Sequence, residues 1–162
     1  VSITLTPKGS GVVAVSSGGV TLSGGTALNS YVEGPFAPTV TLVGGVGNTV
    51  PVYTTNTGRY TRIGNRVFVD IYLNADGGAE GAGSGTINIA LPIAVSASAG
   101  TIEIPCGIVL NNVSMYGVYG WMGASSTTIA LVYINGTTET QITGDLQNNA
   151  TRSIRLSFSY EV

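Results

Sequence analysis

Short β-prone runs alternate with turn-forming residues along the whole chain. Runs rich in Val, Ile, Thr and Tyr recur roughly every ten residues and are separated by Gly, Asn, Pro and Ser. No window of helical length places apolar residues at positions i, i+3 and i+4. This pattern predicts an all-β domain.

Three runs show the alternation most clearly. In residues 67–74, one face holds Val67, Val69, Ile71 and Leu73, and the other holds Phe68, Asp70, Tyr72 and Asn74. In residues 152–161, one face holds Arg152, Ile154, Leu156, Phe158 and Tyr160, and the other holds Ser153, Arg155, Ser157, Ser159 and Glu161. Between them, Ile87, Ile89 and Leu91 share one face of a run that Pro92 ends. Such half-buried strands, some joined by long loops, predict an antiparallel two-sheet β-sandwich of jelly-roll type.

The first thirty residues differ from the rest. They contain short β-prone pieces, Ile3 to Thr6, Val12 to Val15 and Val20 to Leu22, between glycine turns and carry no aromatic side chain. Small hairpins are marginally stable in water, so this segment is expected to order by pairing with its own copies or by lying on the main domain. We therefore predict a β-rich, shaft-like lead-in over residues 1–30 and a β-sandwich head over residues 31–162.

Composition excludes two classes of partner. Charged residues make up 9% of the chain, against about 25% in a typical globular domain, and the net charge is −2. Nucleic-acid binding depends on a basic field, which this chain lacks, so nucleic acid is not expected as a partner. No apolar stretch approaches the ~20 residues that span a bilayer, so membrane insertion is not expected.

Several stretches resemble a known family when taken in order. They are "EGPFAPTVTLVGG", "YTTNTGRYTRIGNRVFVDIYL", "GSGTINIALPIAVSA" and the terminal "RLSFSYEV". The most specific piece runs from Gly58 through Tyr60, Thr61, Ile63, Gly64 and Asn65 into the Val67 strand, and is followed by the Leu91-Pro92 strand end. Across residues 33–162 this order resembles the C-terminal β-sandwich domains of bacteriophage tail fibres and tailspikes.

The resemblance implies a virion protein on an exterior appendage. It would form a homotrimer, contact other virion proteins, and act as a receptor-binding or trimer-forming head that recognises a carbohydrate on the host cell surface. The alternative is a structural virion protein, such as a head fibre or capsid decoration protein, that binds no glycan.

Catalytic chemistry has few candidate residues. The chain contains no histidine, which excludes a Ser-His-Asp or Cys-His arrangement, and its eight carboxylates form no recognisable local pair. Cys106, the only cysteine, lies in the apolar run "IEIPCGIVL" and is interpreted as a buried structural thiol. Asp76 and Glu80 share a glycine-rich loop over residues 76–85 without the pattern of a calcium loop, so we interpret it as flexible and solvated. No catalytic residue, cofactor or metal is predicted; a polysaccharide-degrading activity would fit only if this chain were an appendage of a longer enzyme.

Candidate carbohydrate contacts lie in "NNVSMYGVYGWMG", residues 111–123. Tyr116, Tyr119 and Trp121 stand there among glycines, which leave aromatic faces open to the C–H face of a sugar. By strand parity Tyr119 and Trp121 share one face and Tyr116 the other. The alternative is that these rings fill the space between two sheets.

Three arginines, Arg59, Arg62 and Arg66, cluster before the Val67 strand. A guanidinium fork matches a carboxylate, so they could clamp an acidic sugar. Arg62 and Arg66 have the same sequence parity and Arg59 differs, and a turn at Gly64-Asn65 is expected to break the register between them. We favour the interpretation that they are outward strand residues with a structural role.

Overall fold

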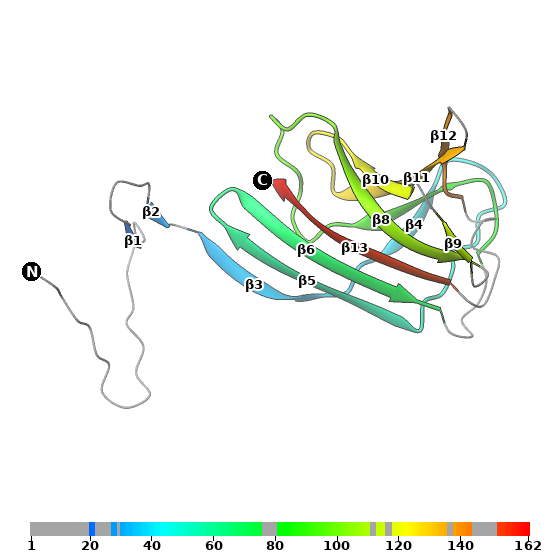
Figure 1. Cartoon of the computed structure of the whole chain (residues 1–162), viewed down its shortest axis with the longest axis horizontal. Coiled ribbons are helices and arrows are strands. Elements are labelled where there is room, and N and C mark those ends of the chain that lie inside the picture. The colour runs from blue at the N-terminus through cyan, green and yellow to red at the C-terminus, as the bar shows by residue number, and fades with distance from the viewer. Residues whose placement is uncertain are drawn as a thin grey trace, which may run out of the picture.

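The computed structural model describes residues 20–21, 27–28, 30–75, 81–110, 113–115, 118–135, 138–143 and 152–162. Within these ranges every regular element is a β-strand, and all strand pairs are antiparallel (Figure 1). The described residues contain no helix that could cross a membrane. The all-β prediction is confirmed.

From β3 onward, the strands form two sheets that enclose one core. Sheet 1 contains β3 (Tyr31–Phe36), β5 (Thr55–Ile63), β6 (Arg66–Asn74), β13 (Arg152–Glu161) and the second half of β8 (Ile102–Leu110), with β9 (Val113–Met115) paired to β8. Sheet 2 contains the first half of β8, β10 (Val118–Met122), β11 (Thr128–Asn135), β7 (Thr86–Ala90) and β4 (Val40–Val43), with β12 (Thr138–Gln141) paired to β11. The predicted antiparallel β-sandwich is confirmed; its assignment as a jelly roll stays a prediction.

Strand β8 joins the two sheets. Its residues up to Pro105 pair with β10, and from Cys106 onward they pair with β13. One strand therefore passes from sheet 2 into sheet 1, as happens at the corners of β-sandwiches.

The opposite side of the sandwich is open. There β3 is the last strand of sheet 1 and β4 the last strand of sheet 2, and only residues 37–39 separate them. On this side of the sandwich, the free edges of the two sheets therefore belong to one stretch of chain, residues 31–43.

The β5–β6 hairpin has the turn that the sequence predicts. Ile63 pairs with Arg66, so Gly64 and Asn65 form a two-residue loop. Gly64 has φ +61°, and a positive φ at the first loop position is what a tight hairpin turn matching the strand twist requires. The two strands stay in register along their whole length.

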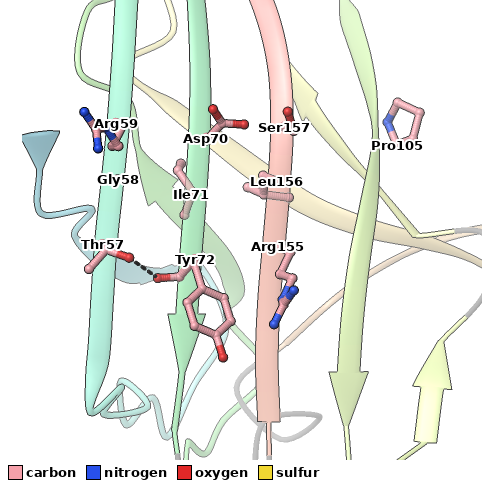
Figure 2. A pocket seen from close by; sticks show the side chains of 10 residues that line it. All are labelled: Thr57, Gly58, Arg59, Asp70, Ile71, Tyr72, Pro105, Arg155, Leu156 and Ser157. Carbon is pink, nitrogen blue, oxygen red and sulfur yellow. Dashed lines mark hydrogen bonds between the residues drawn. The ribbon is translucent and has the colours of Figure 1, made fainter. Parts of the chain in front are cut away.

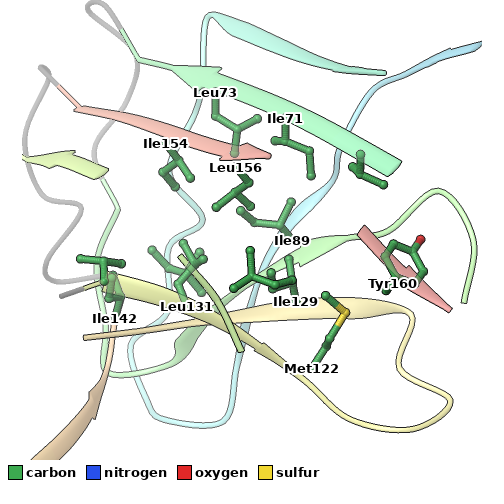
Figure 3. Close-up of a cluster of buried hydrophobic side chains, with 14 of the residues drawn as sticks. Ile71, Leu73, Ile89, Met122, Ile129, Leu131, Ile142, Ile154, Leu156 and Tyr160 are labelled. Carbon is green, nitrogen blue, oxygen red and sulfur yellow. The ribbon is translucent and has the colours of Figure 1, made fainter. Parts of the chain in front are cut away.

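The core lies between the sheets, as the alternation predicts (Figure 3). Its buried members are Val67, Val69, Ile71, Leu73, Ile87, Ile89, Val95, Ile104, Val118, Met122, Ile129, Leu131, Ile142, Ile154, Leu156 and Tyr160. Each fully buried Val, Leu or Ile side chain stabilises the fold by roughly 1.5–3 kcal/mol. The sandwich is held by this layer, and outward residues on both sheets are left free for other roles.

One charged side chain is buried at the end of the core. Arg152 is 1% exposed, and its Nη2 donates a hydrogen bond to the carbonyl oxygen of Val52 at 2.9 Å. Its guanidinium lies 5.4 Å from the ring centre of Tyr53, and burial raises the pKa of Tyr53 well above its ordinary value. Arg152 therefore ties the segment before β5 to the start of β13.

The predicted lead-in is only partly within the described residues. β1 (Val20–Thr21) and β2 (Ala27–Leu28) pair with each other and form a separate two-stranded sheet. The predicted strands at residues 3–6 and 12–15 lie outside the described residues, and the division at residue 30 stays a prediction.

Candidate functional site

Strand β10 carries an exposed indole on the outer face of sheet 2. Val118, Gly120 and Met122 are buried, whereas Trp121 is 44% exposed. The ring is therefore not a filler between the sheets. Its directly opposite neighbour on β11 is Ala130, whose small side chain leaves the ring uncovered on that side.

A shallow groove begins at this ring and crosses sheet 2 toward β4. Its volume is about 710 Å³, and its lining is Val43, Gly44, Thr86, Asn88, Trp121, Ala130, Val132 and Gln141. None of these side chains is charged. The nearest outward charge on the same row is Glu103, which pairs with Trp121 from the β8 side and does not line the groove.

Amide and hydroxyl groups form the polar part of the groove. The hydroxyl of Thr86 donates a hydrogen bond to Oε1 of Gln141, and Nδ2 of Asn88 donates to Oγ1 of Thr128 at 3.3 Å. Oδ1 of Asn88 is buried and has no hydrogen-bond partner within the described structure. An aromatic ring beside such groups can hold a polar, uncharged ligand but supplies no group for acid–base chemistry.

Two glycine-rich loops, residues 44–49 and 81–85, adjoin the groove next to Gly44 and Thr86, which line it. Backbone hydrogen bonds join Thr49 and Ala82 in both directions, at 2.9 and 3.0 Å. Asn48 holds both loops, because its Nδ2 donates to Gly44 O at 2.7 Å and its Oδ1 accepts from Gly85 N at 3.0 Å. Residues 81–85 are thus bound to their neighbours, which corrects the prediction of a wholly flexible loop; residues 76–80 lie outside the described residues.

The tight approach of these loops explains their glycines. An added Cβ at Gly45 would lie 2.3 Å from the backbone nitrogen of Gly85, and Gly45 itself has φ +65°. A side chain there would clash with backbone atoms and would require a left-handed conformation.

A second hollow lies on the outer face of sheet 1 (Figure 2). Its volume is about 620 Å³, and its lining is Thr57, Gly58, Arg59, Asp70, Ile71, Tyr72, Pro105, Arg155, Leu156 and Ser157. The guanidinium of Arg155 lies over the ring of Tyr72, 4.6 Å from its centre. Unlike the groove on sheet 2, this face carries charges of both signs.

The three clustered arginines do not form one patch. Arg62 pairs with Val67 on β6 and donates from Nε to Gly64 O at 2.8 Å, whereas Arg66 donates from Nη2 to Ser159 Oγ at 3.0 Å. Arg66 also lies 4.0 Å from Glu161, an exposed ion pair that contributes little. Because the hairpin sets Arg66 opposite Ile63, Arg66 shares the outer face with Arg59 and not with Arg62, so the turn breaks the register as predicted. Arg62 stands opposite the buried Val67, so the prediction of an outward residue is wrong for Arg62.

The predicted aromatic site is only partly assembled. Trp121 lines the groove, and Tyr119 lies one pleat away on the same face, as predicted, but does not line it. Tyr116 lies outside the described residues, as do Asp76 and Glu80. Cys106 is placed in β8, where it pairs with Leu156, but its side chain lies outside the description. The described residues contain no cluster of potential metal ligands.

Sequence reasoning missed the polar residues Thr86, Asn88 and Gln141, which line the groove together with Trp121. The signal for one of them was present, because Ile87 and Ile89 point inward and so place Asn88 outward. The sequence does not show, however, that β7 lies two strands from β10, in the register that pairs Ala130 with both Trp121 and Asn88.

Comparisons with known proteins leave the family open. No protein-family model matches this chain, and no curated protein matches it significantly.

Proposed function

We propose that this chain is a non-enzymatic carbohydrate-binding head of a phage tail fibre or tailspike, located on the exterior of the virion. The groove beside Trp121 recognises a glycan of the host cell surface. The observation that carries this proposal is the exposure of the Trp121 ring above an uncharged groove.

The chemistry of the groove suits a sugar. Indole rings stack on the apolar C–H faces of pyranoses, while hydroxyl groups pair with amides and hydroxyls such as those of Thr86, Asn88 and Gln141. The groove is shallow, so side-chain contacts of this kind hold the ligand without enclosing it.

The open side of the sandwich supports the proposed homotrimer. Nine large hydrophobic side chains are exposed in the described structure, and six of them lie within residues 31–52: Tyr31, Val32, Val43, Val46, Val50 and Val52. The only charge in that stretch is Glu33, whose carboxylate accepts a hydrogen bond from the hydroxyl of Tyr31 at 2.6 Å. Copies of the chain would meet along these free edges. Light scattering coupled to size exclusion should give about three times 16.4 kDa, and a monomer at micromolar concentration would contradict the trimer.

A glycan array tests the proposed ligand class. The intact protein should bind a defined set of bacterial surface glycans, Trp121→Ala should lose at least tenfold in affinity, and Trp121→Phe should retain part of the binding because a ring remains. Glu103→Gln, beside the ring but outside the groove, is the matched control and should bind normally. Unchanged binding by a folded Trp121→Ala variant would refute the site.

The second candidate is a structural virion protein that binds no glycan. The exposed valines of residues 43–52 favour an assembly role, because several exposed apolar side chains in one segment are typical of an interaction site. Cosedimentation with phage capsids, together with an empty glycan array, would decide for this alternative.

A further inference from the structure

Three adjoining hollows on the outer face of sheet 1 share one carboxylate. Asp70 lines the hollow of about 620 Å³ and also two smaller ones, of about 130 and 290 Å³. The smallest hollow places Asp70 together with Arg59 and Phe68, and its rim includes Glu33, whose carboxylate accepts the hydrogen bond from Tyr31. Asp70, Arg59 and Phe68 come from the adjacent strands β5 and β6.

Two charged groups of this face, Arg59 and Asp70, are set opposite each other without pairing. Arg59 and Asp70 are direct cross-strand neighbours, yet among the described residues neither side chain takes part in a hydrogen bond or ion pair. Figure 2 shows the two side chains directed away from each other. Arg59 therefore keeps free donors and Asp70 keeps free acceptors, close enough for one ligand to reach both.

An exposed aromatic ring completes the face. Phe68 is 48% exposed, and its direct cross-strand neighbours are Thr61 on β5 and Ser159 on β13. Both neighbours are small, so the ring is open to solvent. It lies one pleat from Asp70 on the same side of β6.

We propose that this face is a second saccharide site, separate from the Trp121 groove, that binds a neutral sugar. The apolar face of the sugar lies on Phe68, and its hydroxyl groups donate to Asp70 and accept from Arg59.

The mixed charges select the ligand. A hydroxyl is both a donor and an acceptor, so a polyol satisfies a carboxylate and a guanidinium together. An acidic sugar or a phosphate would be repelled by Asp70, and a cationic ligand by Arg59. The acidic-sugar clamp considered for the arginine cluster therefore fits this face poorly, since Arg59 stands opposite Asp70 and Arg66 lies beside Glu161.

The two sites would act independently within one chain. They lie on the outer faces of different sheets, with the core between them, and share no lining residue. Two weak contacts on one head raise the avidity for a dense glycan layer without a new contact at either site.

Amide chemical-shift mapping tests the proposal. The uniformly ¹⁵N-labelled full chain is titrated with the methyl glycosides of glucose, galactose and mannose, with N-acetylglucosamine, and with glucuronic acid as the acidic comparison. At least one neutral sugar should shift amides around Phe68 and Asp70. Asp70→Asn, which keeps the shape of the side chain, should weaken this response at least tenfold, and Phe68→Ala should abolish it. Glu161→Gln, an exposed carboxylate at the end of the same sheet, is the control and should leave it unchanged.

Four results would overturn the second site. They are no shifts on β5 and β6 with any neutral sugar, a response to glucuronic acid alone, shifts that survive both Asp70→Asn and Phe68→Ala, or sugar-independent shifts that follow protein concentration and so assign the face to self-association. Failure of the Trp121 groove is separately visible, because Trp121→Ala should remove only the shifts on sheet 2.

Discussion

The outer faces of the two sheets differ in chemistry although they cover the same core. The face of sheet 1 carries Arg59, Asp70 and Arg155 as well as the exposed ring of Phe68, whereas the residues that line the groove of sheet 2 with Trp121 are all uncharged. Each ring has a small side chain directly opposite it on at least one side, Ala130 for Trp121 and Thr61 and Ser159 for Phe68. The comparison shows that strand alternation determines which residues face outward, while strand register determines which side chains lie next to each ring.

The largest expected effect comes from breaking the core that supports both faces. Leu156 is 2% exposed between the sheets, and Leu156→Ala should lower the free energy of unfolding by about 2–5 kcal/mol through lost burial and a residual cavity. Ser157→Ala, one residue along and pointing outward, is the matched control and should change it by less than about 0.5 kcal/mol. Urea denaturation measures both, and similar losses in the two variants would contradict the assigned faces.

The next largest effect is expected in the two glycine-rich loops beside sheet 2, where two glycines of similar φ differ in their surroundings. Gly45→Ala should lower the free energy of unfolding by about 2–4 kcal/mol, because the new Cβ meets the backbone of Gly85 at 2.3 Å and the residue must keep φ +65°. Gly47 has nearly the same φ, +67°, but nothing within 4 Å of an added Cβ. Gly47→Ala should therefore lose only about 1 kcal/mol, from the left-handed conformation alone. Equal losses by thermal or urea unfolding would show that the loops are not packed as described.

Much of the fold could be predicted because its signals are local. The buried residues of β6 and β13 follow directly from period-2 alternation, and Gly64-Asn65 marks the hairpin turn between β5 and β6. Pro92 likewise limits β7, which ends at Ala90. Each of these features depends on neighbours in sequence.

The sites were less predictable because they depend on pairings between distant segments. Trp121 could be singled out as an aromatic among glycines, but its neighbours Ala130 and Asn88 come from strands that only the register brings together. The opposition of Arg59 and Asp70 required the exact length of the Gly64-Asn65 turn, since a one-residue change would reverse every face on one strand.

Alkaline pH should act through the buried phenols of Tyr160 and Tyr53, because burial raises the pKa of both. Burial raises the pKa of Tyr160 to about 12 from 10.0, and the hydroxyl donates to Ile93 O at 2.6 Å. Because the folded state holds the neutral phenol more firmly than the unfolded state does, this stabilisation is complete below pH 10 and is lost as the pH rises toward 12. The melting temperature should fall across that interval, and Tyr160→Phe should reduce the fall. A melting temperature that is flat from pH 9 to 12 would contradict the burial of these phenols.

The smallest expected effect on stability is also the one that separates binding from folding. Trp121 and Phe68 are 44% and 48% exposed on opposite faces, so Trp121→Ala and Phe68→Ala should each change the free energy of unfolding by less than about 1 kcal/mol. The two variants should nevertheless lose different amide responses to sugar, the first on sheet 2 and the second on sheet 1. Urea denaturation of both proteins, alongside the sugar titration, checks this. A loss of several kcal/mol in either variant would mean that its ring supports the fold, and would remove the reason for assigning that face to a ligand.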